Sequence, residues 1–183
     1  FDKTGTLTEG RPSVTEVVSL VGREEDLVRW AAAVESASEH PLGRAIVDAA
    51  HGRGIRPSDV DEFEAIPGQG VRGRVDGRFV RVGSLQWLSD VTHPAGTEER
   101  IRVLESEAKT VIGVEVEGSG LAGLLVISDR VAAGAAEAIR GLKDLGIEPV
   151  LLTGDNERTA GAVAAQLGIG RTIANALPAE KLE

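Results

Sequence analysis

Apolar and polar positions follow a helical pattern in the first third of the chain after one extended run. A run rich in apolar residues over 14–21 predicts a strand that ends at Gly22. Apolar residues then recur every three to four positions, which predicts a helix to about Ala37. Pro41 suits the first turn of a second helix, which we expect to end near 52–54.

The pattern changes to short extended runs after the second helix. The runs 63–66, 70–75 and 78–83 are predicted to be strands, and Asp76-Gly77 separates two of them by the two residues typical of a hairpin. We expect four more elements before residue 129: a short helix around 85–88, a charged surface helix over 97–108, and strands at 110–117 and 121–127.

From Asp129 the chain alternates helices and strands. The predicted order is a helix with one apolar face, a strand, a second helix closed by Gly168, and a short strand. This alternation is typical of a doubly wound α/β sheet. The first helix face is marked by Val131, Ala135, Ile139 and Leu142 with Gly146 at its end, and the strands are expected at 147–152 and 171–174.

Composition narrows the classes of function. The 183 residues are 42% hydrophobic and 27% charged, which indicates a globular protein. A net charge of −9 argues against a general nucleic-acid or anionic-membrane surface. The absence of cysteine excludes disulfides and thiol chemistry within these residues, and we assign no metal role to His51 or His93. The chain shows neither a signal peptide nor an apolar run of about 20 residues.

The candidate chemistry begins in the stretch Asp2-Lys3-Thr4-Gly5-Thr6-Leu7-Thr8. Asp2 is its only nucleophile, Lys3 adds a positive charge, and Gly5 lets the backbone turn tightly with its N–H groups near a ligand. A carboxylate beside such donors can attack a phosphoryl group and hold it as an aspartyl-phosphate. The simpler alternative is a strand and turn in which the Asp only caps the backbone.

Two further sites carry residues suited to phosphate. Thr153-Gly154-Asp155 follows a predicted strand, at the sheet edge where open α/β folds bind ligands. The alternative for these residues is an ordinary helix N-cap. Lys181 lies near a proline-led helix start and carries an ammonium group suited to phosphate, although a lysine at such a position is usually only solvated.

Three short motifs in the middle of the chain suit a purine nucleotide. In Ser38-Glu39-His40-Pro41-Leu42, the His40 ring can stack on a base and Glu39 can accept a hydrogen bond from an exocyclic amine. Gly68 and Gly70 in Gly68-Gln69-Gly70 let the backbone approach the base and phosphates closely, and Val82-Gly83-Ser84 is a third short glycine motif. The alternatives are a helix-start residue for His40 and an ordinary turn for the Gly-x-Gly motif. The predicted nucleotide-binding residues are therefore Glu39, His40, Gly68, Gly70, Val71, Gly83 and Ser84.

The opening motif resembles the phosphorylation signature of the P-type ATPases, which belong to the haloacid-dehalogenase-like phosphotransferases. The Ser-Glu-His-Pro-Leu element is similar to that of the heavy-metal-transporting branch, P1B. The resemblance implies an α/β fold: an incomplete, haloacid-dehalogenase-like, doubly wound phosphorylation domain, interrupted by an α+β nucleotide-binding domain with an antiparallel sheet. We expect the phosphorylation domain at 1–17 and 120–183 and the insertion at 18–119.

The resemblance also implies a mechanism. ATP would bind the insertion, and its γ-phosphate would pass to Asp2, with Mg²⁺ held at Asp2 and Thr4. The implied catalytic residues are Asp2, Lys3, Thr4, Thr153, Gly154, Asp155 and Lys181. The implied partners are the transmembrane and actuator domains of a full-length pump at the cytoplasmic face of the plasma (inner) membrane. The fragment itself would be soluble, with no nucleic-acid partner and no direct membrane contact.

The chain departs from the family pattern at several points. Ser84 stands where many relatives carry Asn, and the segment from Asp129 to Ala132 lacks the usual Pro and Lys. The second magnesium carboxylate of the family would lie beyond Glu183, and only Phe1 precedes Asp2. We therefore expect an excised piece of a larger protein that binds ATP weakly and turns it over poorly. Monovalent copper is the first expectation for the metal, ahead of zinc, cadmium or cobalt.

Other functions stay open from the sequence. A soluble phosphatase with a cap domain is disfavoured because the position of its second Asp, the general acid, is occupied by Thr4. A non-catalytic nucleotide-binding module would leave Asp2 inert. A potassium-pump subunit is a weaker alternative, since it should lack the Ser-Glu-His-Pro-Leu element.

Overall fold

A computed structural model describes residues 1–176 of the chain, which form two compact units. We call Ser13–Glu98 with Val111–Ile127 the antiparallel unit. The parallel unit consists of Phe1–Pro12, Glu99–Thr110 and the chain from Ser128. The chain therefore enters and leaves the antiparallel unit twice.

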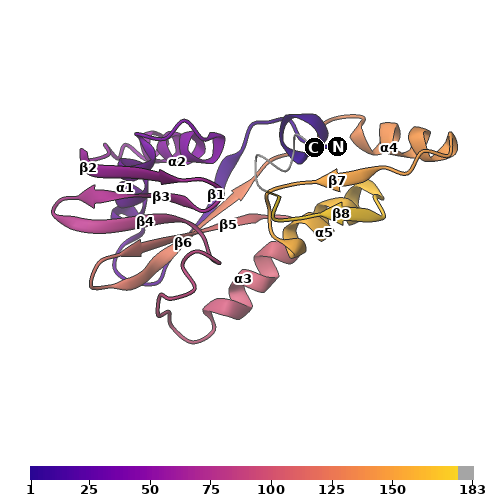
Figure 1. Ribbon diagram of the computed structural model, residues 1–183. Helices are drawn as coiled ribbons and strands as arrows, with labels where there is room; N and C mark the ends of the chain where they lie inside the picture. Colours follow the sequence, from indigo (N-terminus) through magenta and orange to yellow (C-terminus); the bar gives the residue numbers. More distant parts are fainter. Residues whose placement is uncertain (177–183) are drawn as a thin grey trace. The chain divides into compact units, whose positions relative to one another are not determined.

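The antiparallel unit is a six-stranded sheet with two helices on one face (Figure 1). Its strands lie in the order β1-β6-β5-β4-β3-β2, and β2 to β5 pair as antiparallel neighbours. The elements are β1 (Ser13–Ser19), α1 (Glu24–Glu35), α2 (Pro41–Gly52), β2 (Val60–Ile66), β3 (Gly70–Val75), β4 (Arg78–Ser84), β5 (Thr110–Val116) and β6 (Gly120–Ser128).

Residue chemistry explains the register of this sheet. Asp76 and Gly77 both have positive φ, at 49° and 80°, as a two-residue hairpin turn with the twist of the strands requires. The turn pairs Val75 with Arg78, which sends alternate residues of β3 and β4, such as Val80 and Val82, into the core. There they pack with the apolar faces of α1 and α2 in one cluster.

The parallel unit contains a short parallel sheet with its own core. Strands β7 (Val150–Leu152) and β8 (Arg171–Ile173) pair in parallel, and Asp2 forms a parallel bridge with Leu152 on the other side of β7. Helices α4 (Ala135–Asp144) and α5 (Glu157–Leu167) supply most of the core, together with Leu7 and Leu151. Helix α3 (Thr97–Ser106) belongs to this unit from Glu99 onward.

Four local predictions are corrected by the structure. Residues 85–90 form consecutive turns instead of a helix, and α3 ends at Ser106 because Ala108 adopts a φ of 62°. Val131 precedes α4 and bridges Thr8, so it is not on the helix face. The strand expected from 147 begins only at Val150, because the Ile147 N–H caps α4 at the Leu142 carbonyl and Pro149 has no N–H.

The predicted fold class is confirmed: a doubly wound portion is interrupted by an α+β unit with an antiparallel sheet. In the structure β1 and β6 complete the sheet of the antiparallel unit, and the domain boundaries at 17/18 and 119/120 stay a prediction. No helix among residues 1–176 is long and apolar enough to cross a bilayer.

Candidate functional site

Asp2 lies at the carboxyl edge of the parallel sheet. The Phe1 amino group donates to the Val150 carbonyl at 2.7 Å, and the Leu152 N–H donates to the Phe1 carbonyl at 2.8 Å. These bonds place the exposed Asp2 beside the end of β7, and Thr153 follows that strand directly. Two predicted site residues therefore share the edge where parallel sheets bind ligands.

The chain turns back immediately after Asp2. The Thr8 N–H donates to the Lys3 carbonyl at 3.0 Å, and Gly5 at the turn has a φ of 76°, a conformation that favours glycine. Thr4 stays exposed on this turn. The buried Thr8 hydroxyl donates to Asp129 at 2.6 Å, which ties the turn to the segment that enters α4.

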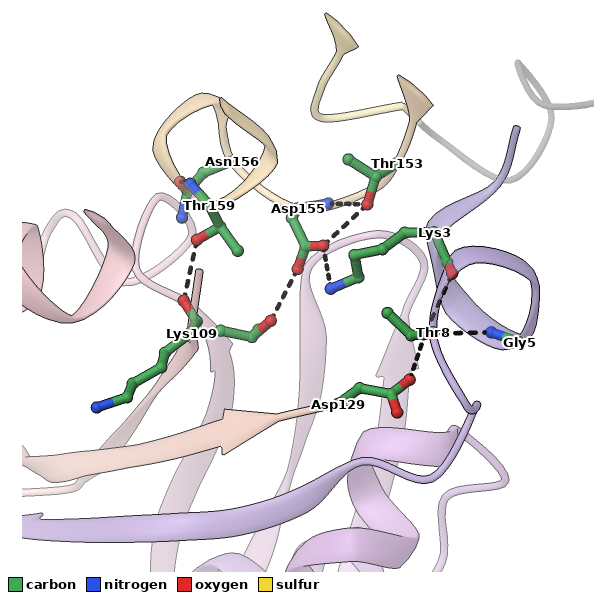
Figure 2. Close-up of polar contacts among 10 residues, drawn as sticks. Lys3, Gly5, Thr8, Lys109, Asp129, Thr153, Asp155, Asn156 and Thr159 are labelled. Carbon is green, nitrogen blue, oxygen red and sulfur yellow. Dashed lines mark hydrogen bonds and ion pairs between the residues drawn. The ribbon is translucent and has the colours of Figure 1, made fainter. Parts of the chain in front are cut away.

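Asp155 is the polar centre of this site. Figure 2 shows its carboxylate between the Lys3 ammonium group and the Thr153 hydroxyl. Thr153 Oγ1 donates to Oδ2 at 2.9 Å, and Thr110 Oγ1 donates to Oδ1 at 2.9 Å. Burial alone would raise the pKa of Asp155, but the charge and hydrogen bond of Lys3 and the two threonine hydroxyls outweigh it and lower that pKa.

The geometry changes the interpretation of two residues that were expected to contact phosphate. Lys3 is buried and ion-paired with Asp155, and the hydroxyl of the buried Thr153 also donates to that carboxylate. Asp155 is thus a structural anchor for both side chains, while Gly154 is exposed at the same edge. Lys181 lies outside the described residues.

In the antiparallel unit, His40 caps the start of α2. Its Nδ1 accepts a hydrogen bond from the Leu42 N–H at 3.2 Å, which leaves the ring proton on Nε2. Partial desolvation lowers the pKa of His40, which favours the neutral ring that this acceptor role requires. Glu39 beside it is exposed. The loop between α1 and α2 therefore presents a neutral imidazole next to a carboxylate.

Glu35, which the sequence analysis missed, lies at the end of α1 just before this loop. Glu35 is 8% exposed, and its Oε2 is buried without a hydrogen-bond partner among the described residues. Burial raises its pKa to about 7, although a hydrogen bond with Ser38 opposes the shift. A Cβ atom on Gly43 would lie 2.3 Å from Oε2, so a larger residue there would displace the carboxyl group from its present position.

The glycine motifs meet where β3 pairs with β4. Gly70 faces Gly83, and a Cβ on Gly83 would lie 2.4 Å from the Gln69 carbonyl oxygen and 2.8 Å from the Trp87 ring. Part of the need for glycine is therefore internal packing. Ser84, next to Gly83, accepts from the Trp87 N–H at 3.3 Å.

Two further residues that were predicted to bind nucleotide, Gly68 and Val71, differ in what they can offer a ligand. Gly68 has a φ of 72° in the turn before β3, a conformation that favours glycine. The Val71 side chain packs in the hydrophobic core, which leaves only its backbone for a ligand.

With this geometry in view, comparison with known proteins gives the family. A family model described as haloacid dehalogenase-like hydrolase matches residues 1–183. The chain belongs to the haloacid dehalogenase-like hydrolases. In this chain the parallel sheet has the exposed carboxylate of Asp2 at its edge.

Within this family, the proteins that the chain resembles are P-type ATPases. The chain is 45% identical, over 98% of its length, to a copper-transporting P-type ATPase of Rhizobium leguminosarum bv. viciae, of which it covers 22%. It resembles the catalytic domain of the CPx-ATPase CopB-B (TM-score 0.74, 28% identity, all of this chain and 62% of that one). It also resembles a zinc-transporting PIB-type ATPase (TM-score 0.66, 38% identity, all of this chain and 29% of that one).

These likenesses confirm the resemblance stated from the motifs. The chain spans about a quarter of the length of the first curated relatives it matches.

Proposed function

We propose that this chain is the ATP-binding and aspartyl-phosphorylation portion of a heavy-metal-transporting P-type ATPase. The observation that carries the proposal is the position of Asp2: an exposed carboxylate at the carboxyl edge of a parallel sheet, beside Thr153 and ahead of a glycine turn. Such a carboxylate can attack the γ-phosphate of ATP and hold the phosphoryl group as an acyl phosphate.

In the parallel unit we assign the phosphoryl contacts to the exposed edge. Asp2 is the nucleophile, and the exposed Thr4 and Gly154 donate to phosphoryl oxygens. Lys3 and Asp155 hold the edge in shape through their ion pair, and the bond from Thr153 to Asp155 orients the Thr153 side chain beside the phosphoryl group. The predicted role of Lys181 in neutralising the phosphoryl charge belongs to the same proposal.

The donor set at this edge fits Mg²⁺. Magnesium is bound in nucleotide sites by one or two carboxylates together with substrate phosphates. Asp2 offers such a carboxylate, and Thr4 adds an exposed oxygen two residues later. The ion would neutralise charge on the phosphates, while Asp2 and Thr4 would hold it at the edge.

In the antiparallel unit we assign the purine to the loop between α1 and α2. His40 presents a neutral ring for stacking and an Nε2–H donor, and Glu39 accepts from an exocyclic amine. Glu35 Oε2, in the last turn before this loop, has no partner among residues 1–176, and we assign it a third polar contact to the base. Gly68, Gly70, Gly83 and Ser84 would lie along the rest of the nucleotide, and Val71 would contribute its backbone.

The larger context is part of the same proposal. The remaining three quarters of such a protein would supply the transmembrane and actuator domains, with these residues on the cytoplasmic face of the plasma (inner) membrane. Copper is the proposed cargo, because the curated relative of 45% identity is named as a copper transporter. The zinc transporter among the structural neighbours shows that proteins with this catalytic region differ in their metal.

Labelling of the full-length protein with ATP tagged at the γ-phosphate tests the proposal. We expect a phosphoprotein that is stable in acid and released by hydroxylamine, as an acyl phosphate is, and absent from Asp2→Asn. Nucleotide binding without any such label would instead support a non-catalytic binding module. Rapid hydrolysis of small phosphate esters without a trapped intermediate would support a phosphatase.

A further inference from the structure

The segment Glu99–Thr110, which we call the strap, belongs to the parallel unit although it interrupts the antiparallel unit in sequence. The buried Glu105 accepts hydrogen bonds from Asn156 at 2.8 Å and from Arg158 at 2.7 Å, both near the start of α5. The Lys109 carbonyl accepts a bond from the Thr159 hydroxyl at 3.0 Å (Figure 2). The strap is thus fixed to α5 at two successive points.

The third attachment of the strap differs in kind. Thr110 Oγ1 donates a hydrogen bond to Asp155 Oδ1 at 2.9 Å. The other oxygen, Oδ2, forms the ion pair with Lys3 and accepts the hydrogen bond from Thr153. The bond from Thr110 is charge-assisted. It holds Oδ1, the carboxylate oxygen that does not take part in the ion pair with Lys3. The orientation of the carboxylate, and with it that of the Lys3 and Thr153 side chains, depends on both of its oxygens being held.

Asp155 connects the strap with the nucleophile through the backbone. Lys3 directly follows Asp2, and Thr153 directly follows Leu152, the residue that bridges Asp2 in the sheet. A carboxylate that holds these two side chains therefore fixes the chain on both sides of Asp2. Small displacements of a reacting group lower the rate of transfer steeply, because catalysis depends on a near-attack geometry.

We propose that Thr110 is a positioning residue for phosphoryl transfer, whose hydroxyl fixes the Asp155 carboxylate that orients Lys3 and Thr153 beside Asp2. The inference rests on the function proposed above. Thr110 is also the first residue of β5, two residues before Ile112, which pairs with Ser84. A strand of the nucleotide-binding sheet therefore begins with a residue of the phosphorylation site.

The test compares three variants in the full-length protein. Thr110→Val removes the hydroxyl at nearly constant volume, and Thr110→Ser restores it. Thr159→Val is the matched control, because it removes another strap hydrogen bond, to Lys109, without touching Asp155. For each variant we would measure the rate of acyl-phosphate formation at saturating ATP, the ATP concentration for half-maximal rate, and the melting temperature.

We expect Thr110→Val to slow acyl-phosphate formation at saturating ATP about tenfold while the half-saturating ATP concentration changes less than twofold. Thr110→Ser and Thr159→Val should stay within about threefold of the unmodified protein. Thr110→Ala, which loses the hydroxyl without placing a methyl group against the carboxylate, replaces Thr110→Val if the latter fails to fold.

An unchanged rate in Thr110→Val, an equal loss in Thr159→Val, or no rescue by Thr110→Ser would each overturn the inference. Failure of the function itself is recognised separately, because the unmodified protein would then form no acyl phosphate that Asp2→Asn abolishes.

Discussion

Glu35 should make the stability of the antiparallel unit depend on pH, and Glu35→Gln should remove that dependence. Glu35 is 8% exposed, and its buried Oε2 has no partner among the described residues. Burial raises its pKa from the ordinary 4.5 to about 7. Between these two values the folded state keeps a proton that the unfolded state has lost, so stability falls as the pH rises.

The size of the effect follows from the two pKa values. A separation of about 2.5 corresponds to roughly 3 kcal/mol, at about 1.4 kcal/mol for each unit of pKa. The contribution is fully present below pH 4.5 and is lost as the pH rises through about 7. Glutamine has nearly the same shape without the charge, so Glu35→Gln should gain up to about 3 kcal/mol over the unmodified chain between pH 4.5 and pH 8.

Urea unfolding followed by tryptophan fluorescence would measure this effect. Both tryptophans of the chain, Trp30 and Trp87, lie in the antiparallel unit, so their signal reports its unfolding. Glu39→Gln removes an exposed carboxyl group from the neighbouring loop and controls for the change in net charge. If Glu35→Gln differs from the unmodified chain by the same free energy of unfolding at pH 4.5 and pH 8, burial does not raise the pKa of Glu35.

Three further predictions concern the nucleotide surface and the phosphorylation edge. His40→Asn should keep the cap of α2, and hence the melting temperature, but weaken ATP binding at least tenfold by calorimetry; equal affinity would rule out a role for the ring. Gly83→Ala should cost about 1–3 kcal/mol in urea unfolding, because its Cβ would meet the Gln69 carbonyl and the Trp87 ring; an unchanged midpoint would contradict the packing described. Asp155→Asn should slow acyl-phosphate formation more than Thr110→Val does, since it also weakens the hold on Lys3, and the opposite order would speak against Asp155 as the anchor.

The fold could be predicted from the sequence best where the local turn and strand pattern agrees with the tertiary packing. The Asp76-Gly77 turn and the alternating residues on either side specify a hairpin with one register, and the structure confirms it. The predictions failed where a tertiary contact competes with a local pattern. Val131 continues the apolar spacing of α4, but it pairs with Thr8, which lies more than a hundred residues away in sequence.

The site was predicted as a set of motifs, whereas the structure shows how their side chains are engaged. Lys3 and Thr153 are suited to phosphate by chemistry, but only the structure shows both bound to Asp155. Thr110 belongs to no motif, so its bond to Asp155 leaves no signal in the sequence. Glu35 could have been found from the sequence, because it lies seven residues after Val28 and therefore on the same, buried face of α1.

The chemical identity of the phosphorylated residue is the most direct test of the central claim. The full-length protein would be incubated briefly with Mg²⁺ and ATP, quenched in acid, and reduced with borohydride, which converts an aspartyl phosphate to homoserine. We expect mass spectrometry to find homoserine at position 2, in the peptide that contains Lys3 and Thr4, and only after incubation with ATP. Homoserine at another aspartate, or a phosphoryl group that stays on a serine or threonine, would contradict it.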